Sequence, residues 1–470
     1  MTDLAPRVAP PHAPLLRRVA PALLGYMAVR ALGLVVLAGW SAARGKSAYT
    51  LLTARWDSLW YTRVAKLGYG YEVRLPNGDV HSNLAFFPLL PWLERLLHAV
   101  GPLSYADAGF VVSLLASLAA ASGIFAVAEH VYGPRAGVCA VLLWALLPVG
   151  IVQSMAYSES LFTALAAWSL YAVLTGRWVS AGVLAALAGL TRPVGLAVVA
   201  AVWVAAVTSF VRDRSARATH GAHTSEHAPT AAGDARSGRT AHSGGTDATT
   251  HASSASEGAY VTTCAPSSST GPDGTTRAPS YPTGPQDTAL VPARTPGARG
   301  ASRAGAGRRV LGMLLAPLGT AGYVLWVGHR TGRGPLGYLD VQAGWRNGFD
   351  GGYAFARFVA DKFTSLPSAL AGAGLIIGVV LLILLYVTGV RQRQPVALLV
   401  YTGVVLALAL CASSYFGSKP RLMMPAFPVL FPLARALARL RTSRAALVTA
   451  GVTAATAAYG AFWLNGSGPP

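Results

Sequence analysis

Charged side chains are scarce in this sequence. Asp, Glu, Lys and Arg make up only 12% of its 470 residues, against roughly 25% in ordinary soluble domains. A soluble chain of this length would divide into several domains, and each would need a polar surface. Because 53% of the residues are hydrophobic, the composition cannot cover such surfaces. It excludes an ordinary soluble protein and predicts a chain whose outer solvent is lipid.

Cysteine is also scarce, and no pattern of metal ligands is visible. The three cysteines, Cys139, Cys264 and Cys411, have neither the spacing of a metal site nor that of a disulfide framework. Five of the ten histidines lie in the stretch 212–308, without compact ligand spacing. They are His220, His223, His227, His242 and His251. We therefore expect no metal and no cofactor.

Acidic residues are few, 18 against 38 Lys and Arg, which gives a net charge of +20. Such a charge suggests nucleic acid as a partner. The basic residues, however, flank apolar runs instead of forming one basic face, so we expect no nucleic acid. Anionic membrane lipids and a phosphate-bearing lipid substrate account for the same charge.

Long apolar runs dominate what remains. Each approaches the roughly 20 residues that a spanning helix needs. We expect about 11 transmembrane helices, at 20–43, 108–128, 137–154, 160–175, 179–190, 193–211, 309–328, 366–390, 395–413, 423–440 and 445–464. The fold class is thus an all-α polytopic membrane protein. The first run is too long for a signal core and is read as an uncleaved helix.

The runs and the positive charges around them predict a topology with the N-terminus inside. The regions are a cytoplasmic N-terminus (1–19), an N-terminal transmembrane module (20–211) with a large first outer loop (44–107), a linker (212–308), a C-terminal transmembrane module (309–464) and a tail (465–470). The linker is rich in Ser, Thr, Ala, Gly and Pro without hydrophobic period, and is predicted to be disordered and cytoplasmic.

The acidic residues outside the linker favour the outer side. Of 18, seven lie in 212–308 and eleven remain. Nine of the eleven fall on the predicted outer side: Asp57, Glu72, Asp79, Glu94, Asp107, Glu159, Asp340, Asp350 and Asp361. The sequence therefore predicts carboxylate chemistry on the extracytoplasmic face of the cell (inner or plasma) membrane.

The segment 55–68 is predicted to be a short helix lying at the membrane interface. At 100° per residue, Asp57, Trp60, Tyr61 and Val64 share one face, and basic residues including Arg55 and Lys66 share the other. An acid on an apolar face is costly unless it has a partner or a function. Asp57 is therefore either a helix cap or a functional carboxylate, and these alternatives are evenly balanced.

Other polar residues interrupt apolar runs. The segment from Pro91 is either a short helix, 91–100, with Glu94 and Arg95 pointing outward, or a connector that dips into the membrane, and local chemistry favours the connector. Tyr157-Ser158-Glu159-Ser160 sits at an outer helix boundary, where helix capping is favoured over the alternative, a polar contact in a cavity. Arg30, in the first span, is expected to pair with a carboxylate. Arg192 and Arg421, next to apolar runs, are plausible ligands for a lipid phosphate or simple interfacial anchors.

Three of these segments together resemble a known family. Trp56-Asp57, then Gly68-Tyr69-x-Tyr71-Glu72, then Ala85-Phe86-Phe87-Pro88-x-x-Pro91 resemble the first-loop signature of the PIG-V-type mannosyltransferases. Tyr157-Ser158-Glu159-Ser160-Leu161-Phe162 is similar to their second signature. Each motif alone is weak, but the ordered set is specific. The resemblance covers 55–200 well and 309–440 loosely, and the insertion 212–308 departs from the eukaryotic members.

The resemblance implies a fold and an activity. It implies a GT-C-like bundle with short interfacial helices in the first outer loop, and an inverting glycosyltransferase. The donor would be a polyprenyl-phosphate sugar, commonly mannose, and the acceptor a lipid or glycan on the outer face. The key aspartate would be Asp57. Expected substrate-binding residues are Arg55, Trp60, Tyr61, Glu72, Glu159, Arg192 and Arg421.

Other functions remain open. A protein O-mannosyltransferase would carry Asp-Glu in the first loop, whereas Ser58 follows Asp57 here. A transporter or lipid flippase would show two repeated halves, and no convincing repeat is visible. A membrane scaffold would leave Asp57 among aromatic residues unexplained.

Overall fold

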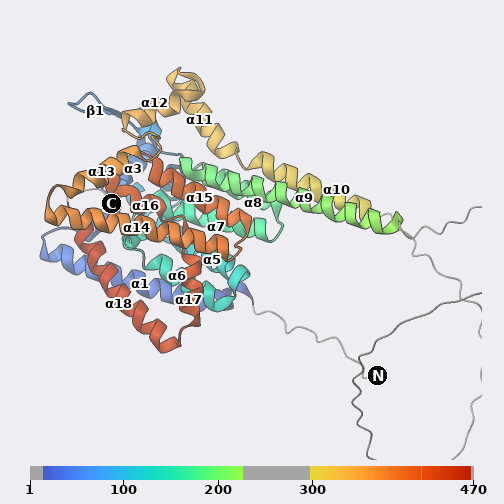
Figure 1. Cartoon of the computed structure of the whole chain (residues 1–470). Coiled ribbons are helices and arrows are strands. Elements are labelled where there is room, and N and C mark those ends of the chain that lie inside the picture. Colours follow the sequence, from blue (N-terminus) through green and yellow to red (C-terminus); the bar gives the residue numbers. More distant parts are fainter. Residues whose placement is uncertain (1–13, 226–296, 414, 467–470) are drawn as a thin grey trace, which may run out of the picture. The chain divides into compact units, whose positions relative to one another are not determined.

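The computed structural model describes residues 14–225, 297–413 and 415–466. Within these ranges it describes the side chains of all residues except 216–225 and 297–304. Cys264, most of the predicted linker and the side chains of its five histidines lie outside the described residues. The chain divides into one compact unit formed by Met1–Ala216 and Arg299–Pro470 and a second, Arg217–Ala298. Apart from the ends of α9 and α10 that fall in the second unit, the elements discussed below belong to the first. Figure 1 draws the whole chain.

Within the described ranges, six helical segments are long and apolar enough to cross a bilayer. They contain α1 (Leu15–Ala43), α5 (Tyr105–Tyr132), α9 (Leu196–Ser225), α10 (Gly297–Leu315) with α11 (Leu318–Thr331), α14 (Leu366–Arg391) and α18 (Thr442–Leu464). A bent pair of helices near the C-terminus adds a possible seventh span. The protein is thus an all-helical, multi-pass membrane protein, as the composition predicts.

Four shorter apolar helices accompany the long ones. They are α6 (Pro134–Ala145), α7 (Ser158–Leu174), α8 (Trp178–Gly189) and α15 (Val396–Cys411). Every one of the eleven apolar runs contains helix, but not every run is a single helix. The six or seven long spans are what the described residues support, and the number eleven remains a prediction.

Prolines break two of the predicted spans. The run 137–154 leaves the α-helix after Ala145 and resumes as the 3₁₀-helix η2 (Gly150–Ser154), with Pro148 between them. The run 423–440 becomes η7 (Phe427–Leu430) and α17 (Phe431–Arg439). It joins the preceding η6 (Phe416–Ser418) and α16 (Lys419–Met423) at a bend of 76°. The prediction of one continuous span was wrong there, because Pro425 and Pro428 lack the N–H that a helix needs.

The first loop after α1 is built from short elements. It contains α2 (Ala48–Thr53), α3 (Asp57–Leu67), β1 (Glu72–Arg74), β2 (Val80–Ser82), η1 (Asn83–Ala85) and α4 (Leu89–Val100). The two strands pair antiparallel in the register Glu72↔Ser82, Val73↔His81 and Arg74↔Val80. A second loop contains η4 (Gly334–Leu336), α12 (Gly337–Gly344), α13 (Tyr353–Ala360) and η5 (Asp361–Thr364), and η3 (Pro193–Gly195) precedes α9. In the described residues, β1 and β2 form the only sheet.

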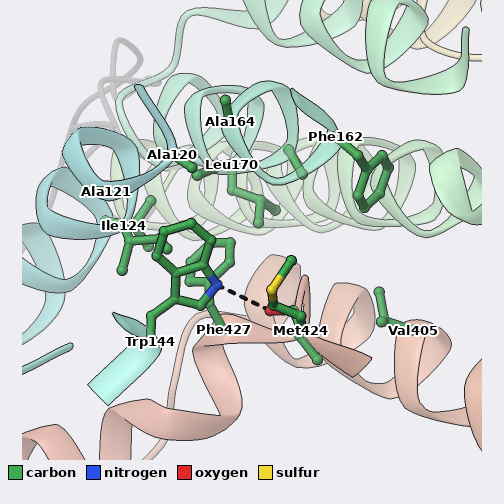
Figure 2. Packing of buried hydrophobic residues seen from close by; sticks show 14 of the residues in the cluster. Ala120, Ala121, Ile124, Trp144, Phe162, Ala164, Leu170, Val405, Met424 and Phe427 are labelled. Carbon is green, nitrogen blue, oxygen red and sulfur yellow. Dashed lines mark hydrogen bonds between the residues drawn. The ribbon is translucent and has the colours of Figure 1, made fainter. Parts of the chain in front are cut away.

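The main hydrophobic core joins the helices of both halves of the sequence. Small residues of α5 and α7, including Ala120, Ala121 and Ala164, let these helices approach closely. Figure 2 shows the indole of Trp144 packed among them, with Nε1 donating to the Met424 carbonyl oxygen at 3.2 Å. This bond connects α6 to the bent segment. It fixes the part of the chain that carries Arg421.

Candidate functional site

Helix α3 begins at Asp57, on a backbone that turns sharply. Trp56 occupies the N-cap position with φ 52°, a left-handed conformation that is unfavourable for a large side chain and is often associated with functional sites. No side chain caps the helix. Asp57 therefore does not act as a helix cap, which was one of its two predicted roles. The predicted inner face is confirmed, because Tyr61 and Val64 are buried while Lys66 is exposed.

The Asp57 carboxylate is paired with a cation 364 residues later in the chain. Arg421 Nη1 donates to Asp57 Oδ2 at 2.7 Å. The guanidinium of Arg421 also stands over the ring of Tyr157, 5.0 Å from its centre. The phenol oxygen of Tyr157 accepts from the Asp57 backbone N–H at 3.4 Å. Asp57, Arg421 and Tyr157 therefore form one contact group at the start of α3.

A second ion pair adjoins the first. Arg192 Nη1 lies 2.7 Å from Glu159 Oε1, and Arg421 Nε lies 3.3 Å from the same oxygen. Arg192 also donates to the Ser158 hydroxyl at 3.2 Å. That hydroxyl shares a 2.7 Å hydrogen bond with the Tyr61 phenol. We call Asp57, Glu159, Arg192 and Arg421 the ion-pair cluster.

The ion-pair cluster is charge-balanced and largely buried. The Glu159 side chain is 1% exposed, Arg421 8% and Arg192 13%, whereas Asp57 is 25% exposed. Asp57 is thus the member that solvent reaches most easily. Buried charges need this pairing, because an isolated charge in a low-dielectric interior is very costly. Burial lowers the pKa of Arg192, but Glu159, Tyr61 and Asp57 together more than offset this, so the net pKa is raised.

The four cluster residues come from four separate parts of the sequence. Asp57 opens α3, Glu159 lies in the first turn of α7, and Arg192 precedes η3 between α8 and α9. Arg421 lies in the short helix α16 of the bent segment. The predicted capping role of Ser158 and Glu159 was wrong, because both side chains point to the cluster instead. The alternative, a polar contact, is correct.

Lys419, two residues before Arg421, has a different environment. Its ammonium donates to the carbonyl oxygens of Ala409 and Ala412 at 2.8 and 2.7 Å, at the end of α15. It also lies over the rings of Phe355 and Phe416. Lys419 is buried and anchors the bent segment to α15. It helps to place Arg421, which the sequence did not reveal.

Three other predicted site residues lie outside the ion pairs. Trp60 belongs to an aromatic group, stacked on Phe86 at 5.6 Å and edge-on to Trp345 at 4.9 Å. Glu72 is exposed in the β1–β2 hairpin. Arg55 turns away and donates to the carbonyl oxygens of Leu464 and Gly466 after α18. The structure therefore brings together Asp57, Glu159, Arg192 and Arg421, with Tyr61 adjoining, and not the rest.

Tyr157 is the contact residue that sequence reasoning did not assign. It contacts both Asp57 and Arg421, and its carbonyl oxygen accepts from Ser113 of α5 at 3.0 Å. The signal was present in the Tyr-Ser-Glu-Ser motif, but a motif does not say which way each side chain points. Burial raises the pKa of Tyr157 well above its usual value, so it stays a neutral phenol.

Arg30 has carbonyl partners instead of the expected carboxylate. Its guanidinium donates to the carbonyl oxygens of Ala145 and Gly150, at the proline break between α6 and η2. A broken helix leaves carbonyls without N–H partners, and Arg30 satisfies two of them. Among the described residues, no carboxylate lies within ion-pair distance of it. The predicted pairing with a carboxylate was wrong, and Arg30 instead connects α1 to the break between α6 and η2.

The segment from Pro91 belongs to the helix α4 and not to the favoured connector, but Glu94 points inward, contrary to the helix alternative. Its side chain is fully buried, and neither carboxyl oxygen has a hydrogen-bond partner among the described residues. It fits because Gly109 of α5 has no side chain: a Cβ there would lie 2.6 Å from Glu94 Oε1. Arg95 is exposed, as predicted. Burial raises the pKa of Glu94 well above its usual value.

This buried carboxyl predicts a pH-dependent stability. Above its ordinary pKa near 4.5 the unfolded chain loses the Glu94 proton while the folded chain keeps it. The free energy of unfolding therefore falls as pH rises from about that value towards the folded-state pKa. Glu94→Gln, which stays neutral, should remove this loss. Thermal unfolding of detergent-solubilised protein is measured from pH 4 to 9. The unfolding temperature of the variant, relative to that of the wild type, should increase as pH rises. A constant difference across the range would contradict the assignment.

Together the apolar helices and the ion-pair cluster define a class: a multi-pass helical membrane protein with a buried, charge-balanced polar site. Residues 42–218 match the family model described as Mannosyltransferase (PIG-V). The family resemblance predicted from the motifs is confirmed over that segment. The matched segment includes three of the four cluster residues, Asp57, Glu159 and Arg192.

Two mammalian relatives match part of the chain. GPI alpha-1,6-mannosyltransferase 2 of Rattus norvegicus is 36% identical over 155 residues, which are 30% of this chain and 29% of the rat protein. The Mus musculus protein of the same name is 34% identical over 154 residues, with the same coverage. The chain thus spans 29% of the length of the relatives that it matches.

One solved structure is similar over most of the chain. It is ArnT from Cupriavidus metallidurans, bound to undecaprenyl phosphate. The identity is 14%, the TM-score 0.45, and the likeness covers 91% of this chain and 63% of that one.

Proposed function

We propose that this chain is a membrane-bound, inverting glycosyltransferase that moves mannose from a polyprenyl-phosphate donor to a hydroxyl group of a lipid or glycan acceptor. The PIG-V family match and the printed activity of the two relatives support the reaction class. The observation that carries the proposal is the position of Asp57. It is a partly exposed carboxylate paired with the buried guanidinium of Arg421, and Arg421 shares its second partner, Glu159, with Arg192.

This chemistry needs one base and cations, but no general acid. The acceptor oxygen attacks C1 of the sugar from the face opposite the phosphate, and the C1–O bond to the phosphate breaks. The electron pair leaves with the phosphate, which is a stable anion and needs no proton. The acceptor hydroxyl loses its proton to the Asp57 carboxylate. A glycosidase would instead need a second carboxyl group as acid.

Arg421 and Arg192 are the proposed ligands of the donor phosphate. In the cluster they neutralise Asp57 and Glu159. A donor phosphate is a further anion, and it would compete with Asp57 for Arg421. Taking Arg421 away would release the Asp57 carboxylate from its ion pair, so donor binding itself would make it available to the acceptor hydroxyl. Glu159, 1% exposed, stays behind as the fixed counter-ion of both guanidiniums.

The remaining predicted residues have supporting roles in this proposal. Tyr61 positions Ser158 and, through it, Arg192. Trp60, half-buried among Phe86 and Trp345, offers an apolar ring face on which a sugar or the prenyl chain can pack. Glu72 is proposed to bind a sugar hydroxyl from the hairpin. Arg55, remote from the other guanidiniums, is the weakest candidate for the donor.

The reaction is proposed to occur on the extracytoplasmic face of the cell membrane. The acidic residues predicted to lie outside include Asp57 and Glu159, and the charges beside the spans favour a cytoplasmic N-terminus. The partners are then the lipid-linked donor, a lipid or glycan acceptor, and the membrane lipids. Nothing in the charge pattern requires nucleic acid.

The test is a transfer assay in sealed membrane vesicles of known orientation. A water-soluble, short-chain polyprenyl-phosphate [³H]mannose should label a lipid or glycan acceptor only when it meets the extracytoplasmic face. A nucleotide sugar should give no label. Labelling only from the cytoplasmic face would overturn the sidedness. Movement of a solute across the vesicle with no sugar transfer would instead favour a transporter.

A further inference from the structure

A cavity of about 310 Å³, open to the surface along much of its extent, lies apart from the ion-pair cluster, beside the ends of two spans. Its lining comes from the turn after α1 and from α2 and its flanks: Lys46, Ser47, Thr50, Leu51 and Arg55. This volume falls in the range of small-ligand sites, roughly 300–1,000 Å³. Two of the five lining residues are cations, and two carry hydroxyl groups.

The cations of this cavity differ from those of the ion-pair cluster in what they contact. Lys46 Nζ donates to the Asn465 carbonyl oxygen at 2.6 Å. Arg55 donates to the carbonyl oxygens of Leu464 and Gly466 at 2.9 and 2.8 Å. These acceptors are neutral, and within the described residues no carboxylate lies within ion-pair distance of either cation. Two positive charges therefore share one cavity without a counter-ion there.

Neither cation has used its full hydrogen-bonding capacity. An ammonium has three N–H donors and a guanidinium has five. The printed bonds take one from Lys46 and two from Arg55. The remaining donors, with the Ser47 and Thr50 hydroxyls, suit an anion with several oxygens. The carbonyl contacts hold the two side chains in place, which lowers the entropy cost of binding.

The cavity lies at the level where lipid head groups are expected. Helices α1 and α18 are both candidate spans, and they end close to it, at Ala43 and Leu464. The two ends are joined by a 3.1 Å hydrogen bond from Asn465 to the Ser41 hydroxyl. Figure 1 shows α1 and α18 side by side. Next to the ends, Trp40 contacts Phe462, which is 59% exposed and offers an apolar surface to acyl or prenyl chains.

We propose that this cavity binds the phosphate group of an anionic lipid, at a site distinct from the ion-pair cluster. The shared chemistry is a lipid phosphate, which either a membrane phospholipid or a polyprenyl phosphate supplies. Arg55 connects the cavity to the start of α3: its guanidinium lies 3.9 Å from the ring centre of Trp56, the residue before Asp57. A bound lipid would fix Arg55 and with it the unusual backbone at Trp56.

The experiment measures thermal unfolding of the purified full-length chain in a neutral detergent. Phosphatidylglycerol, polyprenyl monophosphate, phosphatidylcholine and inorganic phosphate are titrated separately. At least one of the two anionic lipids should raise the unfolding temperature, and the one active at lower concentration identifies the source. Phosphatidylcholine and inorganic phosphate should have little effect. An equal effect of inorganic phosphate, or no shift with either anionic lipid, would overturn the proposal.

Two variants test the cations, and each is compared with its own lipid-free baseline. Lys46→Gln and Arg55→Gln keep an N–H donor for the carbonyl contacts but lose the charge. Each should raise the lipid concentration needed for the half-maximal shift about tenfold, the effect of losing a charge-assisted bond. Arg44→Gln is the matched control, because Arg44 is an exposed cation that does not line the cavity. Equal weakening by Arg44→Gln would show general surface attraction and overturn the site.

The lipid site does not depend on the proposed transfer reaction. Asp57→Asn should leave the phosphatidylglycerol-induced shift as in the wild type, since Asp57 does not line the cavity. A normal shift with no sugar transfer would therefore count against the enzyme proposal alone. Sugar transfer with no lipid-induced shift would count against the lipid site alone.

Discussion

Asp57→Asn should reduce sugar transfer by about 10²- to 10⁴-fold, because an amide cannot accept the proton of the acceptor hydroxyl. The amide keeps nearly the same shape and can still accept a hydrogen bond from Arg421, so expression and folding should be preserved. The measurement is incorporation of mannose from the labelled polyprenyl-phosphate donor by membranes with matched amounts of wild-type and variant protein.

The control for this substitution is Asp361→Asn, which removes an exposed carboxylate in η5, outside the ion-pair cluster. It should keep transfer within about twofold of the wild type. Transfer by Asp57→Asn at the wild-type rate would remove Asp57 as the base. Loss of transfer together with loss of folded protein would assign Asp57 a structural role instead.

Glu159→Gln should lower the free energy of unfolding by about 3–5 kcal/mol, the usual effect of removing one partner of a buried ion pair. The variant leaves Arg192 without a counter-ion and Arg421 with only Asp57, while both guanidiniums remain largely buried. Thermal and denaturant unfolding in detergent measure the loss. Transfer should also fall, because the two proposed phosphate ligands are no longer held.

A double variant shows whether the loss comes from the pair itself. Glu159→Gln with Arg192→Gln removes both charges, so it should be more stable than Glu159→Gln alone. The matched control is Asp340→Asn, which breaks the exposed pair of Asp340 with Arg333, whose side chains are 49% and 66% exposed. That change should cost at most about 1 kcal/mol. If the losses of unfolding free energy from the Glu159 and Arg192 substitutions simply add, the two side chains are not coupled. The description of them as an ion pair in the cluster would then be wrong.

The difference between these two experiments separates chemistry from architecture. Asp57 is the most exposed member of the cluster, and Glu159 is the most buried. A proton acceptor must be reached by substrate, whereas a counter-ion serves best where water does not screen it. We therefore expect Asp57→Asn to lose activity with little loss of stability, and Glu159→Gln to lose both.

Most residues of the site could be predicted from the sequence, but the contacts between them could not. The alternating chemistry of 55–68 placed Asp57 on the same face as Tyr61 and Val64, and the structure keeps that face inward. Arg192 and Arg421 stood out because a cation beside an apolar run needs a partner. Their partners could not be named, since Asp57 and Arg421 are 364 positions apart and only the fold brings them within 2.7 Å.

The errors have a common physical origin. Arg30 was expected to need a carboxylate, but the proline break after α6 supplies two free carbonyls that satisfy it as well. Glu94 was expected to face outward if its segment was helical, but Gly109 on a neighbouring helix leaves room for it. In both cases the deciding atom belongs to another helix. The hydrophobic periodicity of one helix contains no information about an atom on another helix.

The sequence by itself determined that this is a helical membrane protein and which residue types form its polar site, because hydrophobic length and motif order are properties of the chain alone. Only the tertiary structure decided that Arg421 and Arg192 meet Asp57 and Glu159, while Arg55 turns to a separate cavity with Lys46. The reason is geometric: a charge finds its partner through the packing of distant helices, and that packing is settled by the whole core.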